Sequence, residues 1–352
     1  MGDVRNLEVY IINYNGKNTI LSTIQSLYES CDVKVLISVI DDHSADESID
    51  LVKEKYPDIP VYILPYNTKK VNILRNKALQ LSKSEFLFVT DNDLKFDKRC
   101  LTELLKVMES DSKIATCTPR LMYWDQPDKI YAADTKVHFI GSTIADQRDK
   151  IYEGSITPPS TNSGGGICLI RREAAARVGG FDENLMIGWG DDGEFYQRLL
   201  RAGYLCLYVP SAFALHENKI VETLRKNRVV GQTYNRWRFI LSHYSVLLII
   251  LLIPAFLLYE ILQILFVLMK GALKQYLEGN ILVIKNFSSI AGKRKVVQNL
   301  KVVSDNKVLY AGVLFVAPRL VRNYSFIKYI INAFSYFLNF YWSVIKNIIP
   351  KY

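Results

Sequence analysis

The sequence predicts an α/β fold with a mostly parallel sheet that carries helices on both faces, followed by a helical region. Two observations predict the sheet: strand-like and helix-like segments alternate through the first hundred residues, and polar side chains stand where the strands end. A third observation predicts the helical region, because a long uncharged segment lies within a strongly basic last third of the chain. We therefore expect two domains, residues 1–225 and residues 226–352.

The alternation begins with the apolar run LEVYIIN, which predicts a buried strand. The segment after it has Ile20, Ile24 and Leu27 at helical spacing. Ser44 precedes the second helical segment, where a serine favours an N-cap. In chain order, the predicted strands are 7–13, 33–42, 61–66 and 85–93, and the predicted helices between them are 14–30, 44–57 and 69–84.

The segments after residue 100 continue this alternation less regularly. CLTELLKVMES predicts a helix, KIATCTPRLMY predicts a strand, and a long irregular section follows at residues 123–163. A glycine-rich turn then leads into a strand and a helix at 162–183, a further helix at 191–204, and a closing strand pair at 205–217 that ends at His216.

Polar residues mark the predicted strand ends. Asn13, Asp41 and Asn67 lie at or just beyond the first three strands, and Asp91 and Asp93 end the fourth. In parallel sheets, ligands bind at the carboxyl ends of the strands. Two carboxylates one residue apart form a hard-oxygen site that suits Mg²⁺ or Mn²⁺. The alternative is a turn in which the aspartates accept local backbone hydrogen bonds.

A second acidic motif, WGDDGEF, precedes a predicted helix. Asp191 and Asp192 stand at its N-terminus and Glu194 in its first turn, where acids also act as caps. Three acids within four residues exceed what capping needs, because each raises the cost of ionising the next. One of them is a candidate general base. Trp189, between two glycines, either faces a substrate or packs inward.

The order of the motifs resembles the family 2 glycosyltransferases with a GT-A fold, over roughly residues 7–243. The most similar members are the rhamnosyltransferase-like transferases of cell-wall and polysaccharide synthesis. The resemblance rests on seven segments in the right order: IINYNG, VIDDHSAD, RNKAL, FVTDND, GGGICLIRREAAARVGGFDE, WGDDGEFYQRLLRAGY and YVPSAFALHE. It implies a nucleotide-binding GT-A catalytic domain over residues 1–225.

The resemblance also implies a donor site. Asp41 would contact the nucleobase or ribose, and Asn13 and Asn15 would line the same pocket. Arg75 would face the nucleotide or its diphosphate, and Asp91 would lie near the ribose and the metal. The implied donor is a UDP-, dTDP- or GDP-linked sugar, which the sequence does not narrow further.

The metal and the base follow from the same resemblance. Asp93 would ligate Mn²⁺ or Mg²⁺ directly, and His216 would add a ligand from the far side of the site. Asp192 aligns with the family's base. Two departures from the family pattern leave Asp191 open as the base: Asp191 replaces a glutamate, and Glu194 stands where an aspartate is usual.

Three further residues are expected beside the transferred sugar or the acceptor. They are Trp189, Gly165 and Glu194. Gly165 belongs to a glycine turn that either lets a sugar approach the backbone closely or forms a plain loop.

The expected reaction is metal-dependent sugar transfer with inversion, in which Asp192 takes a proton from an acceptor hydroxyl on the face opposite the leaving group. One alternative is a sugar nucleotidyltransferase, although the first loop, NYNGKNTI, lacks the glycine-rich, arginine-containing sequence usual in that class. The other is a non-catalytic membrane scaffold with a nucleotide pocket.

The last part of the chain predicts membrane contact. Residues 239–259 contain no Asp, Glu, Lys or Arg, a length that can span a bilayer. Because basic residues flank the apolar segment on both sides, a single span conflicts with the positive-inside rule. An inserted helical hairpin or helices lying in the interface resolve the conflict, and a buried helix pair in a soluble domain is the alternative. The segment 326–350 has the composition of an interfacial helix.

The charge of the last part of the chain also indicates a membrane as its partner. Residues 217–352 contain 19 Lys and Arg against 5 Asp and Glu. A basic region rich in Ile, Leu, Phe and Tyr indicates an anionic membrane surface, and we expect no nucleic-acid partner. We therefore expect a membrane-associated protein with a cytosolic catalytic domain, acting on a saccharide or lipid-linked acceptor. Five widely spaced cysteines fit a reducing compartment.

Overall fold

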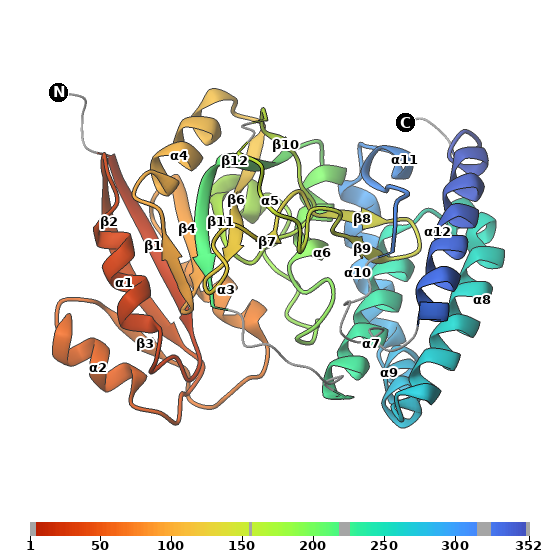
Figure 1. Ribbon diagram of the computed structural model, residues 1–352, viewed down its shortest axis with the longest axis horizontal. Coiled ribbons are helices and arrows are strands. Elements are labelled where there is room, and N and C mark those ends of the chain that lie inside the picture. Colours follow the sequence, from red (N-terminus) through yellow and green to blue (C-terminus); the bar gives the residue numbers. More distant parts are fainter. Residues whose placement is uncertain (1–4, 155–156, 218–225, 315–324, 350–352) are drawn as a thin grey trace. The chain divides into compact units, whose positions relative to one another are not determined.

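The computed structural model describes residues 5–154, 157–217, 226–314 and 325–349 (Figure 1). The chain forms two compact units. The sheet unit comprises residues 1–134, 147–183 and 204–219, and the helical unit comprises residues 135–146, 184–203 and 220–352. The expected boundary at 225/226 adjoins residues 218–225, which lie outside the described ranges. The expected single boundary does not describe this division, because residues 135–146 and 184–203 also belong to the helical unit.

A mostly parallel sheet forms the sheet unit, as the sequence predicts. Within the described residues, ten strands join in one sheet whose main path runs β10-β12-β6-β11-β4-β1-β2-β3, with β5 paired to β12 and β7 to β6. Strand β11 runs antiparallel between β4 and β6. The strands are β1 (Arg5–Asn13), β2 (Val33–Asp41), β3 (Val61–Ile63), β4 (Phe86–Asp91), β5 (Leu94–Phe96), β6 (Ile114–Tyr123), β7 (Ile130–Ala132), β10 (Ser160–Thr161), β11 (Cys168–Arg171) and β12 (Leu205–His216).

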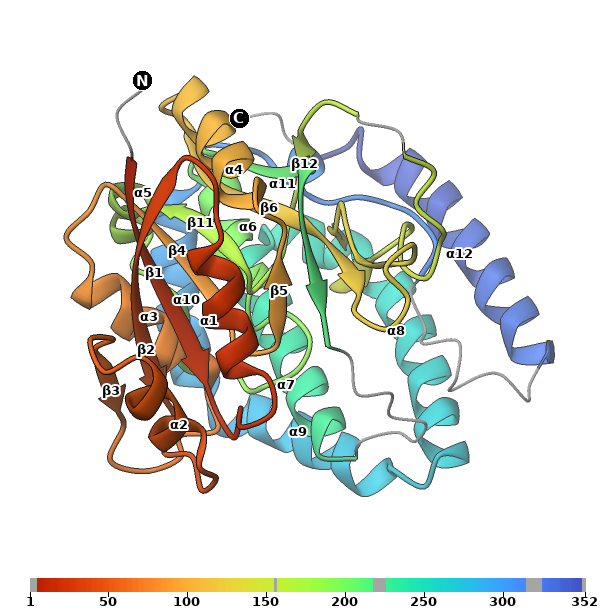
Figure 2. The same ribbon diagram turned by 60° about the vertical axis from the view of Figure 1, so that its left-hand side comes forward.

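Helices cover both faces of this sheet (Figure 2). Val9 and Ile11 of β1 point to one face, where they share a core with α1 and α4. Tyr10 and Ile12 alternate to the other face and are also buried, where α3 packs on β1, β2 and β4. The helices are α1 (Ile20–Tyr28), α2 (Ser48–Lys55), α3 (Val71–Leu81), α4 (Cys100–Ser110) and α5 (Arg172–Arg177).

Strand register brings the polar strand ends together. Strand β1 pairs in parallel with β2 so that Asn13 lies opposite Asp41, and with β4 so that Ile12 lies opposite Asp91. On the other side of the sheet, β12 pairs with β5 so that His216 lies opposite Leu94, the residue after Asp93. The sheet therefore delivers the predicted donor and metal residues to one edge.

The helical unit contains most of the last third of the chain. A small hairpin of β8 (Lys136–His138) and β9 (Ser142–Ile144) belongs to it. The helices are α6 (Gly193–Arg201), α7 (Lys226–His243), α8 (Val246–Met269), α9 (Leu273–Lys285), α10 (Phe287–Leu300), α11 (Asp305–Val308) and α12 (Ser325–Ile345).

The predicted uncharged segment 239–259 is divided between two helices. Helix α7 ends at His243, and Ser245 caps α8 by accepting a hydrogen bond from the amide of Leu248 at 3.3 Å. In the part of the chain that the structure describes, α8 is the one helix long and apolar enough to cross a membrane. The apolar helix is therefore 246–269, and it includes Pro254 and Glu260.

Candidate active site

The floor of the predicted donor pocket is a buried network at the ends of β1 and β2. The Asn13 side-chain amide donates to Asp41 Oδ1 at 2.6 Å and to the Ser48 hydroxyl at 3.0 Å. Ser44 donates to Asp41 with its amide at 2.8 Å and with its hydroxyl. Asn13 and Asp41 are almost completely buried. These contacts hold both Asp41 oxygens in fixed directions.

Ser44 has a different role from the predicted helix cap. Helix α2 begins at Ser48, with Glu47 at its N-cap position, and the Ser44 hydroxyl instead bonds Asp41. The same hydroxyl accepts a hydrogen bond from the Asn15 amide at 2.9 Å. Asn15 is exposed and has a positive φ of 53°, and its side chain accepts from the amide of Ala45 at 2.9 Å. Asn15 therefore fastens the loop after β1 to the loop after β2.

Arg75 is buried on α3 beside the glycine turn. It donates to Asn72 Oδ1 at 3.0 Å, and its guanidinium lies 5.5 Å from the centre of the Phe181 ring. A side chain at Gly166 would collide with the guanidinium, so Arg75 lies directly against this turn. Gly165 precedes it with φ +146°, a conformation that favours glycine.

Asp93, which directly precedes β5, and His216, the last residue of β12, come together. His216 Nε2 lies 3.7 Å from Asp93 Oδ1, and the imidazole stacks on Tyr131 with ring centres 4.2 Å apart. The Arg148 guanidinium covers Tyr131 at 4.5 Å. Burial, aided by the positive charge of Arg148, lowers the pKa of His216 to about 4. The imidazole is therefore neutral at pH 7, the state in which histidine ligates metals.

These two side chains fit one divalent cation shared with a substrate. The described residues contain no cluster of three or more His, Cys, Asp or Glu side chains able to hold a metal. Mg²⁺-type ions are commonly held by one or two protein ligands together with substrate phosphates and water. A separation of 3.7 Å between the imidazole nitrogen and the carboxylate oxygen lets both reach one ion at bond lengths of roughly 2.1 Å. Asp91 is half-buried two residues away.

The acids of the second motif begin α6 in the helical unit. Asp192 is the N-cap residue, and its Oδ1 accepts from the amide of Gly193 at 2.7 Å. Asp191 and Asp192 are both half-buried, so each is open to solvent in part. Gly190 precedes them with φ +79°, which turns the chain into the helix.

Glu194 does not lie where a sugar or acceptor could reach it, contrary to the expectation from the sequence. Its side chain is 3 % exposed and accepts two hydrogen bonds of 2.7 Å from Arg198, while Lys293 and His243 each lie 3.3 Å away. Burial alone would raise the pKa of Glu194, but the charges of Arg198 and Lys293 outweigh it and hold the pKa well below its ordinary value. This ion-pair cluster joins α6 to α7 and α10, so Glu194 holds the fold and is withdrawn as a sugar contact.

Asn235 of α7 fixes the loop that carries Trp189. Its side chain accepts from the amide of Met186 at 3.0 Å and donates to the carbonyls of Met186 at 2.8 Å and Trp189 at 2.9 Å. The half-buried indole packs edge-to-face with the Phe239 ring, with ring centres 5.6 Å apart. The sequence analysis missed Asn235, because nothing in the local sequence indicates which loop an asparagine inside a helix will reach.

The chain is similar in sequence to known glycosyltransferases. The sequence profile of the family described as "Glycosyl transferase family 2" matches residues 8–179, and that of "N-terminal domain of galactosyltransferase" matches residues 152–219. Two curated relatives, from Mycobacterium tuberculosis strains CDC 1551 / Oshkosh and ATCC 25618 / H37Rv, are N-acetylglucosaminyl-diphospho-decaprenol L-rhamnosyltransferases. Each is 46 % identical over 52 residues, which cover 15 % of this chain and 17 % of the relative.

A solved structure shares the fold at low sequence identity. The crystal structure of GalNAc-T7 with UDP, GalNAc and Mn²⁺ superposes with a TM-score of 0.53 and 16 % identity, covering 70 % of this chain and 49 % of that one. The curated relatives align over about a sixth of their own length. With the sheet order and the strand-end residues, these matches show a GT-A fold and support a family 2 glycosyltransferase.

Proposed function

We propose that the protein is an inverting, metal-dependent glycosyltransferase that moves a sugar from a nucleotide-sugar donor to an acceptor hydroxyl. The observation that carries the proposal is the pairing of Asp93 with His216 at the sheet edge of a family 2 fold. The family match favours a transferase over a sugar nucleotidyltransferase. The retained acids at 91, 93 and 192 favour a catalyst over a scaffold.

The donor would lie over the ends of β1, β2 and β4. Asp41 would bond the nucleobase or ribose, with Asn13 holding the Asp41 carboxylate in place and Asn15 closing the pocket wall. Arg75 would face the diphosphate across the glycine turn, and Asp91 would lie near the ribose. A UDP-, dTDP- or GDP-linked sugar fits these roles, and UDP is the nucleotide in the GalNAc-T7 structure.

Asp93 and His216 would hold the cation, Mn²⁺ or Mg²⁺. When bound, such an ion supplies Lewis-acid stabilisation for the charge that develops on the departing diphosphate. Tyr131 supports this role for His216, because the stacked ring fixes the imidazole plane. The low pKa of His216 keeps the imidazole free of a competing proton above about pH 4.

Asp192 would remove the proton from the acceptor hydroxyl, with Asp191 as the alternative base. Attack from the face opposite the leaving group inverts the anomeric centre. The hydrogen bond from the Gly193 amide fixes one Asp192 oxygen, so the carboxylate keeps one orientation as a base must. Trp189 would pack beside the acceptor and Gly165 beside the sugar.

The acceptor would be a lipid-linked saccharide or a growing surface polysaccharide at the cytosolic face of a membrane. The apolar helix α8, the excess of basic residues after residue 216, and the decaprenol-linked acceptor in the name of the curated relatives support this assignment.

Release of free nucleotide from a panel of UDP-, dTDP- and GDP-sugars, with and without Mn²⁺, tests the proposal. We expect Mn²⁺-dependent release with one donor, and a loss of at least about tenfold in Asp93→Asn. Asp58→Asn, a matched change of an exposed aspartate in the same unit, should retain the wild-type rate. Release that is equal with and without divalent cation, or unchanged in Asp93→Asn, would contradict it.

A further inference from the structure

Helix α7 contacts α8 at points spread from the start of α8 to its end. The two helices join at Tyr244 and Ser245 and run antiparallel, since Trp237 meets Phe256 at 5.7 Å and Arg236 forms an ion pair with Glu260 one turn further on. Val229 near the start of α7 shares a core cluster with Val267 near the end of α8. The position of α8 in a membrane is therefore also the position of α7.

Helix α7 is too polar to enter a hydrocarbon core. Its middle contains Asn235, Arg236 and Arg238, and all three are buried against other parts of the helical unit. Arg236 donates to the carbonyl of Ile140 in the loop of the β8–β9 hairpin at 2.9 Å as well as pairing with Glu260. If α8 crossed the bilayer, α7 and this hairpin would cross with it. Charged side chains are rare within membrane-spanning segments, and irregular backbone is tolerated at that depth only where protein buries it or it lines a water-filled cavity.

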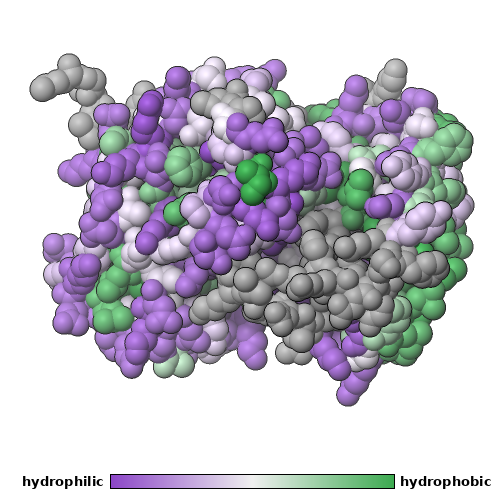
Figure 3. Space-filling view, viewed as in Figure 1, coloured by the Kyte–Doolittle hydropathy of each residue, from purple (hydrophilic) through white to green (hydrophobic). Residues whose placement is uncertain are grey.

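The other side of α8 presents a continuous apolar stripe. Its members recur every three or four residues, so they lie on one face of the helix, and each is between 38 % and 62 % exposed. Figure 3 shows hydrophobic side chains gathered over this part of the helical unit. The stripe, which we call the α8 stripe, consists of Val246, Ile250, Ile253, Leu257, Ile261, Ile264 and Leu268.

Helix α12 lies antiparallel beside α8 and extends this surface. The Tyr341 hydroxyl donates to the carbonyl of Leu251 at 2.5 Å, and Phe334 lies 6.5 Å from Tyr259 between ring centres. Its outer face, the α12 stripe, is mostly aromatic, and tyrosine favours the boundary between lipid and water over the bilayer centre. The α12 stripe consists of Tyr329, Tyr336, Phe340 and Val344, which are 50 % to 76 % exposed.

We propose that α8 and α12 lie in the plane of an anionic bilayer surface, with both stripes in the boundary between headgroups and acyl chains, and that α8 does not cross the membrane. The inference rests on the proposed membrane location and specifies its geometry. The 14-residue excess of basic over acidic side chains in residues 217–352 complements anionic headgroups. Lys270, which directly follows α8, places one of these charges at the end of the stripe.

Depth measurements along the stripe test this geometry. In the full chain with Cys31→Ser, which removes the one exposed thiol, single cysteines at Ile250, Leu257 and Ile264 would carry a nitroxide label. Collision with oxygen and with a water-soluble nickel complex then reports depth in vesicles of phosphatidylcholine and phosphatidylglycerol. We expect the same depth at all three positions, roughly 5–10 Å below the phosphates.

A different depth profile overturns the inference. Ile250 and Ile264 are 14 residues apart, about 21 Å along a helix axis, so a crossing helix would place Leu257 far deeper than at least one of them. Labels that stay fully water-accessible would also overturn it. Nucleotide release measured on the same samples keeps the two proposals apart, because a crossing or unbound helix leaves catalysis intact.

A binding experiment supplies the matched control. Leu257→Ser with Ile261→Ser should lower partition into the same vesicles at least about tenfold. Leu36→Ser with Ile63→Ser removes two apolar side chains of the sheet unit that are about half exposed, and should leave partition unchanged. Equal partition of the two double variants would contradict a role for the α8 stripe.

Discussion

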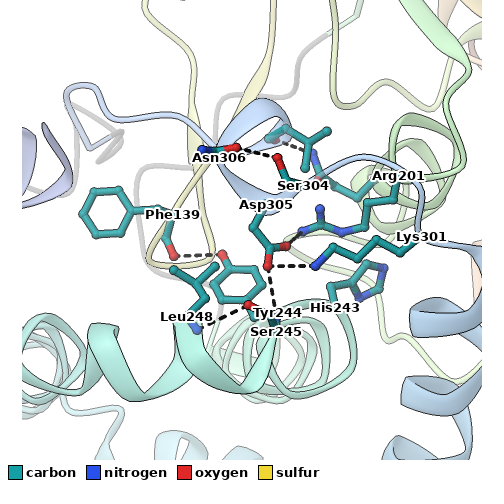
Figure 4. Close-up of polar contacts among 12 residues, drawn as sticks. Phe139, Arg201, His243, Tyr244, Ser245, Leu248, Lys301, Ser304, Asp305 and Asn306 are labelled. Carbon is teal, nitrogen blue, oxygen red and sulfur yellow. Dashed lines mark hydrogen bonds and ion pairs between the residues drawn. The ribbon is translucent and has the colours of Figure 1, made fainter. Parts of the chain in front are cut away.

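Two clusters of side chains, one around Asp305 and one around Asp93, differ in how they surround an acid. In the helical unit, Asp305 is completely buried and bonded to Lys301 at 2.8 Å and the amide of Ser245 at 3.0 Å, with Arg201 at 3.2 Å (Figure 4). In the sheet unit, Asp93 is 31 % exposed and lies 3.7 Å from His216, beyond hydrogen-bond range. The first acid is enclosed by cations of its own chain, whereas the second has a partly exposed side chain beside a neutral imidazole.

The difference teaches which acids to regard as functional. An acid whose oxygens are filled by buried arginine and lysine stabilises the fold, and Glu194 belongs to this class as well. An acid that is partly exposed beside a neutral histidine is the better candidate for a cation ligand. Charge substitution should therefore affect stability in one cluster and activity in the other.

The largest effect is expected at the proposed base. Asp192→Asn should lower the rate of sugar transfer by roughly 10²–10⁴-fold, because the amide cannot accept the acceptor proton. Donor binding, measured by thermal shift, should survive. Asp191→Asn is the matched change, and a larger loss there than in Asp192→Asn would assign the base to Asp191.

The next effect concerns the enclosed cluster. Asp305→Ala should lower the free energy of unfolding by about 3–5 kcal/mol, because it leaves Arg201 and Lys301 buried without their counter-charge. Denaturant unfolding of this variant beside Asp93→Ala measures the contrast. Equal destabilisation by the two substitutions would remove the distinction between the clusters.

A smaller effect is expected at the glycine turn. Gly166→Ala should displace the Arg75 guanidinium, raise KM for the donor, and destabilise the fold by about 1–3 kcal/mol through overpacking. Gly292→Ala is the control, since a side chain there meets no atom within 4 Å. Steady-state kinetics with the donor varied checks the prediction, and an unchanged KM would dissociate Arg75 from donor binding.

The smallest effect is a difference in pH dependence. Burial lowers the pKa of His216 from 6.5 to about 4, so between these values the unfolded chain binds a proton that the native imidazole does not. This contribution to stability is lost as the pH falls through that window. In His216→Gln, the free energy of unfolding should fall less steeply from pH 6.5 to 4, by at most about 1.4 kcal/mol per pH unit. Parallel curves for the two proteins would show that His216 is not held neutral.

The sheet and the polar residues at its strand ends could be predicted from the sequence, because both follow from local patterns. Apolar runs that stop at Asn13, Asp41 and Asp91 define strands and their ends, and parallel pairing then brings these ends to one edge. The motif order placed His216 opposite Asp93, and the structure has their side chains 3.7 Å apart.

Features set by packing between distant segments could not be predicted. Glu194 resembles an accessible acid until His243 and Lys293, about 50 and 100 residues later, enclose it. The stacking of Tyr131 on His216 and the bonds from Asn235 to the Trp189 loop are of the same kind. The assignment of residues 184–203 to the helical unit also depends on such contacts.

Binding of Mn²⁺ in the presence of a nucleoside diphosphate tests the central proposal most directly. Titration calorimetry with UDP, dTDP and GDP in turn would compare the wild type with Asp93→Asn, His216→Gln and the surface control Asp58→Asn. We expect Mn²⁺ affinity to fall at least about tenfold in both site variants and to stay at the wild-type value in the control. Wild-type affinity in Asp93→Asn and His216→Gln would contradict the assignment of these two residues as the metal ligands.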